Sequence, residues 1–259
     1  MDPRQATIRF TGFAELDATE MLLLKDLAGP TRRLSRGETI RKEGEPSPRM
    51  YLLRDGWTAS SIKLADGARQ IIKVHMPGDM LGMPSLAMKY APDTIFALTD
   101  VSLSVVELAA LTRLFTDSPR LAALLFLISQ EERVMLMDRL VALGRTNALI
   151  RLGALLLQLH SRWLRNNPDS GPTFPLPLTQ RDLADLAGLT AVHTSRVLSK
   201  LRRAGILAVR SYTVTIMDLS ALRELVSMPS RELDRNQRWI PSSEVDCDCV
   251  GGRGSASRN

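Results

Sequence analysis

The sequence predicts an α+β protein in which an antiparallel β-roll, one long helix and a basic segment of helices with a β-hairpin follow one another. Turn signals with glycine recur through residues 30–108 at close to the ~8–12-residue spacing of short strands. A helical pattern without internal glycine then runs from Pro119 to Gly144. Residues 147–228 hold ten basic and five acidic side chains, which is +5 of the chain's net charge of +6. The expected parts are residues 1–118, 119–146, 147–228 and 229–259.

The N-terminal part predicts a short helix followed by the roll. Residues 15–28 have an amphipathic helical pattern. The strand-like runs after it are MYLLRDG, WTASSIKL, RQIIKVHM and VSLSVVEL. Asp66 and Gly67 stand between two of these runs, and Asp-Gly is a strong hairpin signal. Residues 30–108 are therefore expected to form a small antiparallel roll.

The long helix is expected to begin at Pro119, because proline suits a first helical turn. Four apolar side chains recur every seventh residue along it: Leu121, Ile128, Met135 and Ala142. This spacing predicts a homodimer in which two such helices pack together. The companion heptad position contains Glu132 and Arg139, so a helix packed on its own roll is the alternative. The residues expected at the dimer interface are Leu121, Leu124, Leu125, Ile128, Met135 and Ala142.

A further helix is expected over residues 147–164, which have a leucine-rich apolar face. The stretch RNNPDSGPTFPLP after it predicts no regular structure. Residues 229–259 contain few apolar side chains and end in Gly, Ser and Arg, which is typical of a disordered tail. Cys247 and Cys249 lie in this tail with no histidine nearby, and two thiols alone rarely hold a metal, so no metal site is expected.

The segment from Thr179 to Gly205 predicts two short helices. Thr179 is a good N-cap, and Asp182 three residues later completes a capping-box pattern. Gly188 ends the first helix, and Thr190 can cap the second, which stops at Gly205. Two short helices joined by a glycine turn form a helix-turn-helix.

The second helix of this unit has two distinct sides. One side can pack on the first helix through Thr194, Val197, Leu198 and Leu201. The opposite side presents Val192, Ser195, Arg196 and Ser199 at helical spacing. Such a side suits a DNA major groove, because Arg can bond to guanine, Ser to several base edges and Val to a thymine methyl. The candidate DNA-contacting residues are Thr179, Gln180, Thr190, Ala191, Val192, His193, Ser195, Arg196, Ser199 and Lys200.

The stretch ILAVRSYTVTIMDL alternates on both sides of Ser211-Tyr212 and predicts a β-hairpin, which would form the wing of a winged helix-turn-helix. A basic segment with these elements in this order favours double-stranded DNA as the partner. The alternative is an ordinary solvated basic surface, with a β-hairpin that serves only to pack against the helices. A second function class keeps the roll as a small-molecule or protein-interaction module in which DNA binding is secondary.

Composition and motifs exclude several other classes of protein. Both cysteines lie in the tail, so the body has no disulfide framework. The N-terminus has no signal pattern, and the longest apolar runs are far shorter than the ~20 residues of a membrane span. A soluble, cytoplasmic protein without a membrane partner is expected. The three histidines stand far apart in sequence, at positions 75, 160 and 193, so no catalytic set is assembled and no enzyme is expected.

The stretch LPLTQRDLADLAGLTAVHTSRVLSKLRRAGILAV resembles the winged helix-turn-helix of the Crp/Fnr superfamily, the regulators related to the cyclic-AMP receptor and the fumarate-nitrate reduction regulator. With the roll and the long helix, the resemblance covers residues 10–225. It implies a cyclic-nucleotide-binding-like roll and a homodimer on a two-fold DNA site, often in contact with RNA polymerase. Arg196 falls at the family's guanine-reading arginine, whereas Val192 replaces a base-reading glutamate.

The sensor half departs from the cyclic-nucleotide binders of that family, which carry Gly-Glu-Leu and then Arg-Ser-Ala. Met83 stands at the position of the glutamate that holds the ribose, and Asp93 stands near the position of the arginine that holds the phosphate. The iron–sulfur members need several cysteines, and this roll has none. The haem members need a His, Cys or N-terminal Pro ligand, and His75, the only histidine of the sensor half, is expected to be an ordinary strand residue. We therefore expect a degenerate or altered effector pocket and no cofactor: no cyclic AMP, haem or iron–sulfur cluster.

Overall fold

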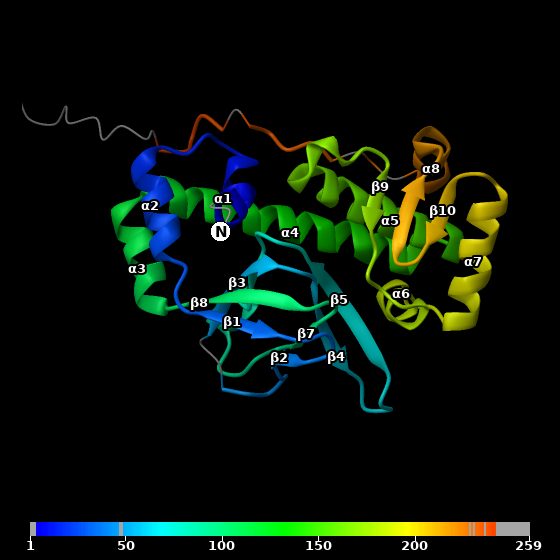
Figure 1. The fold of residues 1–259 in the computed structure, drawn as a ribbon, viewed down its shortest axis with the longest axis horizontal. Coiled ribbons are helices and arrows are strands. Elements are labelled where there is room, and N and C mark those ends of the chain that lie inside the picture. Colours follow the sequence, from blue (N-terminus) through cyan, green and yellow to red (C-terminus); the bar gives the residue numbers. More distant parts are fainter. Residues whose placement is uncertain (1–3, 47–48, 228, 230, 236, 242–259) are drawn as a thin grey trace, which may run out of the picture.

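The computed structural model describes residues 4–46, 49–227, 229, 231–235 and 237–241. One long helix, α4 (Pro119–Arg145), runs along the molecule and joins its two halves (Figure 1). The β-roll lies against the first part of this helix, and helices α5 to α8 gather at its other end. This confirms the expected α+β class with a roll, a long helix and a C-terminal winged helix-turn-helix.

The roll consists of two four-stranded antiparallel sheets with strand orders β1-β8-β3-β6 and β2-β7-β4-β5. The strands are β1 (Thr31–Leu34), β2 (Thr39–Arg41), β3 (Met50–Asp55), β4 (Thr58–Lys63), β5 (Arg69–His75), β6 (Met80–Leu81), β7 (Thr94–Ala97) and β8 (Val101–Val106). A 3₁₀ helix, η1 (Met83–Ala87), follows β6. Leu53, Ile95 and Leu103 are fully buried between the sheets and form part of the roll's core.

The predicted hairpin joins β4 to β5. Its pairs run from Thr58 opposite His75 to Lys63 opposite Arg69. Gly67 has a φ of 85°, a left-handed conformation that glycine adopts without a steric penalty. The β5 strand of this hairpin lies beside helix α6 of the other half (Figure 1). The hairpin is therefore the part of the roll that touches the C-terminal domain most closely.

Three short helices pack around the start of α4. They are α1 (Arg4–Thr11), α2 (Ala18–Asp26) and α3 (Leu108–Asp117). Only α2 was predicted, and Asp17 and Glu20 form a capping box at its start. Helix α3 was not predicted, because its apolar pattern continues directly from the last strand of the roll.

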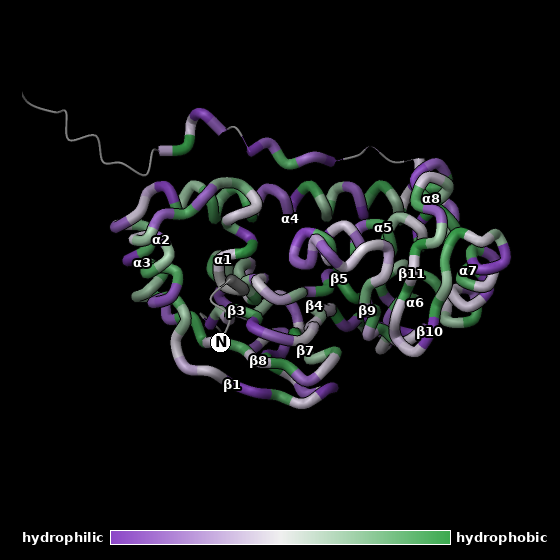
Figure 2. The backbone as a smooth tube through the Cα atoms, turned by 45° about the horizontal axis from the view of Figure 1, so that its top comes forward, coloured by the Kyte–Doolittle hydropathy of each residue, from purple (hydrophilic) through white to green (hydrophobic). Residues whose placement is uncertain are grey.

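The buried side of α4 corrects the expected dimer interface. Leu121, Leu124, Leu125 and Ile128 are almost fully buried in the core that α4 shares with α1, α2 and α3 of the same chain. Ala142 is also buried. Met135 lines a cavity against the roll. The heptad spacing was real, but it marks packing within one chain, which the sequence had left as the alternative. Residues 121–128 of α4 are apolar without a break, and after them hydrophilic and hydrophobic stretches alternate to the end of the helix (Figure 2).

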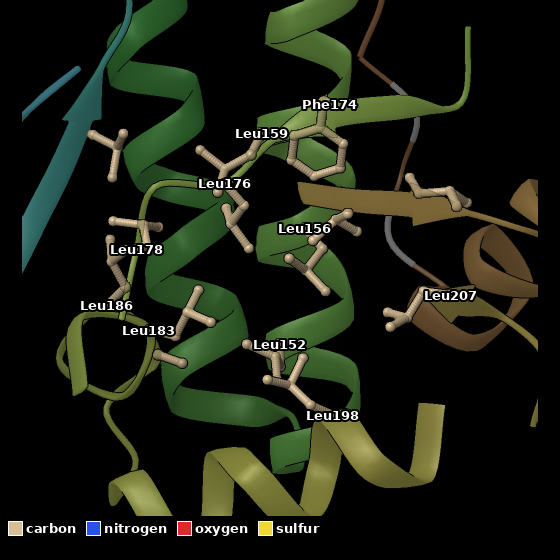
Figure 3. Close-up of a cluster of buried hydrophobic side chains, with 14 of the residues drawn as sticks. Leu152, Leu156, Leu159, Phe174, Leu176, Leu178, Leu183, Leu186, Leu198 and Leu207 are labelled. Atoms are coloured by element: carbon tan, nitrogen blue, oxygen red, sulfur yellow. The ribbon is translucent and has the colours of Figure 1, made fainter. Parts of the chain in front are cut away.

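The C-terminal half is a winged helix-turn-helix built on α5. Its elements are α5 (Ala148–Asn166), η2 (Pro168–Ser170), β9 (Thr173–Pro175), α6 (Gln180–Ala187), α7 (Ala191–Arg203), β10 (Leu207–Arg210), β11 (Thr213–Ile216) and α8 (Leu219–Val226). The stretch predicted to be irregular in fact supplies η2 and β9, and β9 adds a third strand to the predicted wing. Leu156, Phe174, Leu183, Leu198 and Leu207 meet in the common core (Figure 3).

The chain beyond α8 contains no helix or strand among its described residues, yet it is not a free tail. Arg231 pairs with Asp138 of α4 at 2.7 Å. The Trp239 ring packs edge-on against Phe126, with the centroids 6.4 Å apart. This part of the predicted disordered tail therefore lies along α4 (Figure 1). Cys247 and Cys249 lie outside the described residues. No helix in the described ranges is long and apolar enough to cross a bilayer.

Candidate nucleic-acid interface

The start of α6 is held by the predicted capping box. The Thr179 hydroxyl accepts a hydrogen bond from the Asp182 backbone N–H at 3.1 Å, and the Asp182 carboxylate accepts one from the Thr179 N–H at 3.0 Å. Although burial alone would raise it, hydrogen bonds donated to the carboxylate by the Thr179 hydroxyl at 2.6 Å, by the Thr179 N–H and by Arg69 hold the pKa of Asp182 below its usual value. Thr179 and Gln180 remain exposed at the helix start. Their backbone can therefore face a phosphate, since helix N-termini attract anions.

The turn between the two helices depends on Gly188. Its φ of 61° and ψ of 45° place it in the left-handed region, as expected for a residue that ends a helix. A Cβ at this position would lie 3.2 Å from a methyl carbon of Leu143. Arg151 donates to the carbonyls of Ala187 at 3.1 Å and Leu143 at 3.1 Å. Arg151 thus fastens the turn to the junction of α4 and α5, a positioning role that the sequence did not reveal.

The two sides of α7 are sorted as the sequence predicted. The side that faces the domain core is buried and consists of Thr194, Val197, Leu198 and Leu201. On the other side Val192 is 63% exposed, Arg196 is exposed, and Ser195 and Ser199 are half-buried. Exposing the apolar side chain of Val192 to water is unfavourable, so this side of α7 is suited to contact with a partner.

The structure brings most of the candidate residues together. Five of them border one open groove between α7 and the start of α5: Thr190, Val192, His193, Arg196 and Lys200. Ala191 is exposed beside them, and Thr190 caps α7 by accepting from the His193 N–H at 3.2 Å. Thr179 and Gln180 lie apart from this groove, at the start of α6. Arg196 and Lys200 make the groove basic, so it can accept a nucleic-acid backbone and base edges.

The wing follows directly after α7. Leu207 pairs with Ile216 and Arg210 with Thr213 in the β10–β11 hairpin. Its tip, Ser211 and Tyr212, has positive φ angles of 40° and 63°, which is the geometry of a tight type I′ hairpin turn.

The helix-turn-helix is docked on its own roll through α6. Arg69 of β5 reaches Asp185 at 2.7 Å and Asp182 at 2.6 Å. Arg139 of α4 donates to the backbone carbonyl of Leu186, and Gln70 donates to that of Asp185. These contacts join residues that are more than forty positions apart in sequence, so periodicity could not reveal them.

The effector region of the roll also differs from the sequence-based expectation in one respect. Asp93, which stands near the expected phosphate position, is bound by Arg41 of β2. The same guanidinium also donates to the Ser85 hydroxyl. Arg41 was missed because it precedes this stretch by some forty residues and reaches it only through the pairing of β2 with β7. The carboxylate of Asp93 therefore has its own cation within the chain.

Comparison with known proteins agrees with this architecture. The model of the cyclic nucleotide-binding domain matches residues 31–118, and that of the Crp-like helix-turn-helix domain matches residues 150–225. The nitrogen fixation regulation protein FixK of Bradyrhizobium diazoefficiens is 31% identical over 83% of this chain and 89% of its own. The chain belongs to the Crp/Fnr family of transcription regulators.

Other Crp/Fnr relatives support the same assignment. The fumarate and nitrate reduction regulatory protein of Escherichia coli is 27% identical over 85% of this chain and 86% of its own. The solved structure of FixK2 from Bradyrhizobium japonicum matches with a TM-score of 0.69 and 27% identity, over 79% of this chain and 100% of that one. The family consists of DNA-binding transcription regulators and not of enzymes, and this Crp/Fnr protein is a DNA-binding transcription regulator.

Proposed function

We propose that this regulator binds a two-fold DNA site as a homodimer, with α7 of each subunit in the major groove. The observation that carries the proposal is the exposed side of α7, where Arg196 and Val192 border an open groove while the other side is buried. Arg196 bonds to a guanine edge, Val192 meets an apolar base edge, and Lys200 contacts the backbone. Thr179 and Gln180 meet a phosphate at the start of α6.

A gel-shift series tests this reading of α7. Arg196→Ala is expected to weaken binding to the preferred site by ~1–3 kcal/mol, because one bidentate base contact is lost. Lys200→Ala is expected to weaken binding to all sequences alike and to reduce its salt dependence. Arg113→Ala is the matched control, since Arg113 is exposed on α3 of the sensor half. Unchanged affinity and site preference in Arg196→Ala would refute the assignment.

The homodimer proposed here uses the side of α4 opposite the one first expected. Val134, Met137, Leu140 and Val141 form an exposed apolar stripe at helical spacing, and Leu140 is 72% exposed. Exposed apolar stripes on long helices are typical coiled-coil seams. Met137→Asp is expected to convert the dimer to a monomer in light scattering at micromolar concentration. Leu125→Asp would instead unfold the sensor half, because its site is buried within the chain. RNA polymerase is a further partner that family membership suggests.

We also propose that the effector pocket does not accept a cyclic nucleotide. Met83 offers no carboxylate for a ribose hydroxyl, and the acidic Asp93 stands near the position where a phosphate would need a cation. Arg41 is in turn committed to Asp93 and Ser85. Calorimetric titration with cyclic AMP is expected to give no binding at millimolar concentration, and saturable micromolar binding would overturn this part of the proposal. No haem or iron–sulfur cluster is proposed.

A further inference from the structure

The described chain beyond α8 connects two hydrophobic cores. Helix α8 belongs to the core of the winged helix-turn-helix, where Leu222 and Val226 are buried. Seven residues after Val226, Leu233 packs against the core that α4 shares with α1, α2 and α3, and Ile240 packs there too. We call residues 231–235 and 237–241 the C-terminal strap. It leaves the DNA-binding domain and returns to the sensor half along α4 (Figure 1 and Figure 2).

The C-terminal strap is held by an ion pair and by apolar contacts. Arg231 places two guanidinium nitrogens on the carboxylate of Asp138, at 2.7 Å and 3.1 Å, which is a bidentate arrangement. Leu233 is half-buried, and one of its methyl carbons lies 4.0 Å from the position that a Cβ on Gly12 would take, just after α1. Ile240 is half-buried as well. The strap is therefore fastened to the sensor half at more than one point.

The strap attaches the DNA-binding domain to α4 beside the contact that α6 makes. Arg139 of α4 donates to the Leu186 carbonyl at the end of α6, and the adjacent Asp138 binds Arg231 of the strap. Arg231 follows Val226, the last residue of α8, by five residues, and five extended residues span at most ~18 Å. Helix α8 therefore cannot swing far from the middle of α4 while the strap stays bound.

The arrangement that the strap fastens leaves the exposed side of α7 uncovered. Val192 is 63% exposed, and Arg196 borders an open groove. A strap that inhibited DNA binding would instead hold this side of α7 against the rest of the chain. In a dimer, two α7 helices must meet half-sites ~34 Å apart at the same time. A domain that is already fixed in one orientation loses less freedom when both half-sites are bound.

We infer that the C-terminal strap holds each DNA-binding domain in the orientation that a two-fold site requires, so that it strengthens binding to two half-sites and not to one. The inference rests on the proposed function, a homodimer on a two-fold DNA site. The strap itself touches no DNA. It is a positioning segment, which acts through α8 on the domain that carries α7.

The test uses two duplexes: the two-fold site selected from a random pool, and the same duplex with one half-site scrambled. Leu233→Asp in the full-length protein puts a charge against the sensor core and is expected to release the strap. Binding to the two-fold site is expected to weaken about tenfold, because the preset orientation is lost, and binding to the single half-site to change less than about twofold. Leu22→Asp, the same change at an exposed site on α2, is expected to alter neither.

Reversal of the ion pair provides a second set of variants, which leaves the sensor core untouched. Arg231 is exposed, and Arg231→Glu is expected to weaken binding to the two-fold site about two- to fivefold, because a glutamate there repels Asp138. The double variant Arg231→Glu/Asp138→Arg restores the pair and is expected to restore wild-type binding. If Leu233→Asp does not fold, this set decides, and an unchanged affinity in Arg231→Glu or a failure of the double variant to restore binding counts against the strap.

Hydrogen exchange and light scattering complete the test. Leu233→Asp is expected to speed amide exchange in the strap and to remain a dimer. The inference is overturned if exchange is unchanged, if the dimer is lost, if affinity for the two-fold site is unchanged or higher, or if both duplexes lose affinity equally. Equal affinity of the wild type for the two duplexes would instead refute the proposed binding of two half-sites.

Discussion

The two ends of α4 place their polar groups in opposite environments. At the DNA-binding end, the polar side chains of α7 point outward, and the buried side of the helix is almost wholly apolar. Where the roll meets α4 and α5, charged groups are buried together: Arg9, Asp79 and Arg162, here called the sensor cluster, are each less than a tenth exposed. The first arrangement is suited to binding a partner such as DNA, because its polar groups face solvent. The second is closed, since nearly every charge already has a partner within the chain.

The sensor cluster therefore has the larger effect on stability. Asp79 binds Arg162, lies 3.4 Å from Arg9 and accepts from the Met76 N–H at 3.0 Å. Asp79→Ala is expected to lower the free energy of unfolding by ~3–5 kcal/mol, because the buried guanidinium of Arg162 loses its counter-ion, whereas Arg9 keeps Glu131 at 3.0 Å. Urea denaturation measures this loss. Asp169→Ala, at an exposed site in η2, is expected to change stability by less than ~0.5 kcal/mol. Similar losses in both variants would contradict the account.

Acid should weaken the ion pairs that Asp79 makes in the sensor cluster. Although burial alone would raise it, Arg162, Lys73 and Arg9 hold the pKa of Asp79 far below its usual value. A carboxylate with a lowered pKa adds stability above its unfolded value of ~3.9 and loses it as the pH falls below that value. Wild-type stability is therefore expected to fall on acidification below pH ~4, and Asp79→Asn is expected to fall less steeply. Equal slopes in denaturation series between pH 5 and pH 2.5 would exclude Asp79 as the cause.

Substitutions of two glycines near the DNA-binding end of α4 are expected to have opposite effects on stability. Gly188→Ala is expected to cost ~1–2 kcal/mol, because alanine is strained in the left-handed region and its Cβ would crowd Leu143. Gly144→Ala in α4 is expected to stabilise by up to ~1 kcal/mol, because an added Cβ there meets no atom within 4 Å and alanine favours a helix. Thermal unfolding of both variants checks the opposite signs. A gain in stability from Gly188→Ala would show that the turn is not held as described.

The smallest effect is expected at the start of α6. Thr179→Ala removes the cap of this helix and is expected to cost ~1 kcal/mol. Thr179→Ser keeps the hydroxyl and is expected to restore most of the loss. Denaturation gives the stability, and a gel shift shows whether DNA affinity falls with it. A loss in Thr179→Ser as large as that in Thr179→Ala would argue against capping.

The same contrast explains what the sequence could predict. The helix-turn-helix depends on local signals, namely the caps at Thr179 and Thr190 and the turn at Gly188, and these are visible in sequence order. The contacts of Arg41, Arg139 and Arg151 were missed, because each joins elements that only folding brings together.

Three other misses have physical causes of their own. Strand β9 was missed because prolines surround it, and it forms only when β11 pairs with it. Helix α3 follows an apolar strand without a break, so its start gives no signal. The heptad spacing in α4 is real, but an apolar stripe in a sequence does not show whether it packs against its own chain or against a second chain.

The most direct test of the account is selection of bound DNA from a random pool by the wild type and by Arg196→Ala. The wild type is expected to select a two-fold symmetric site whose half-sites lie one helical turn, ~34 Å, apart. Arg196→Ala is expected to select the same spacing but to lose preference at one base pair in each half-site. Identical selected sites for both proteins, or a wild-type site without two-fold symmetry, would contradict the claim that paired α7 helices recognise the DNA sequence.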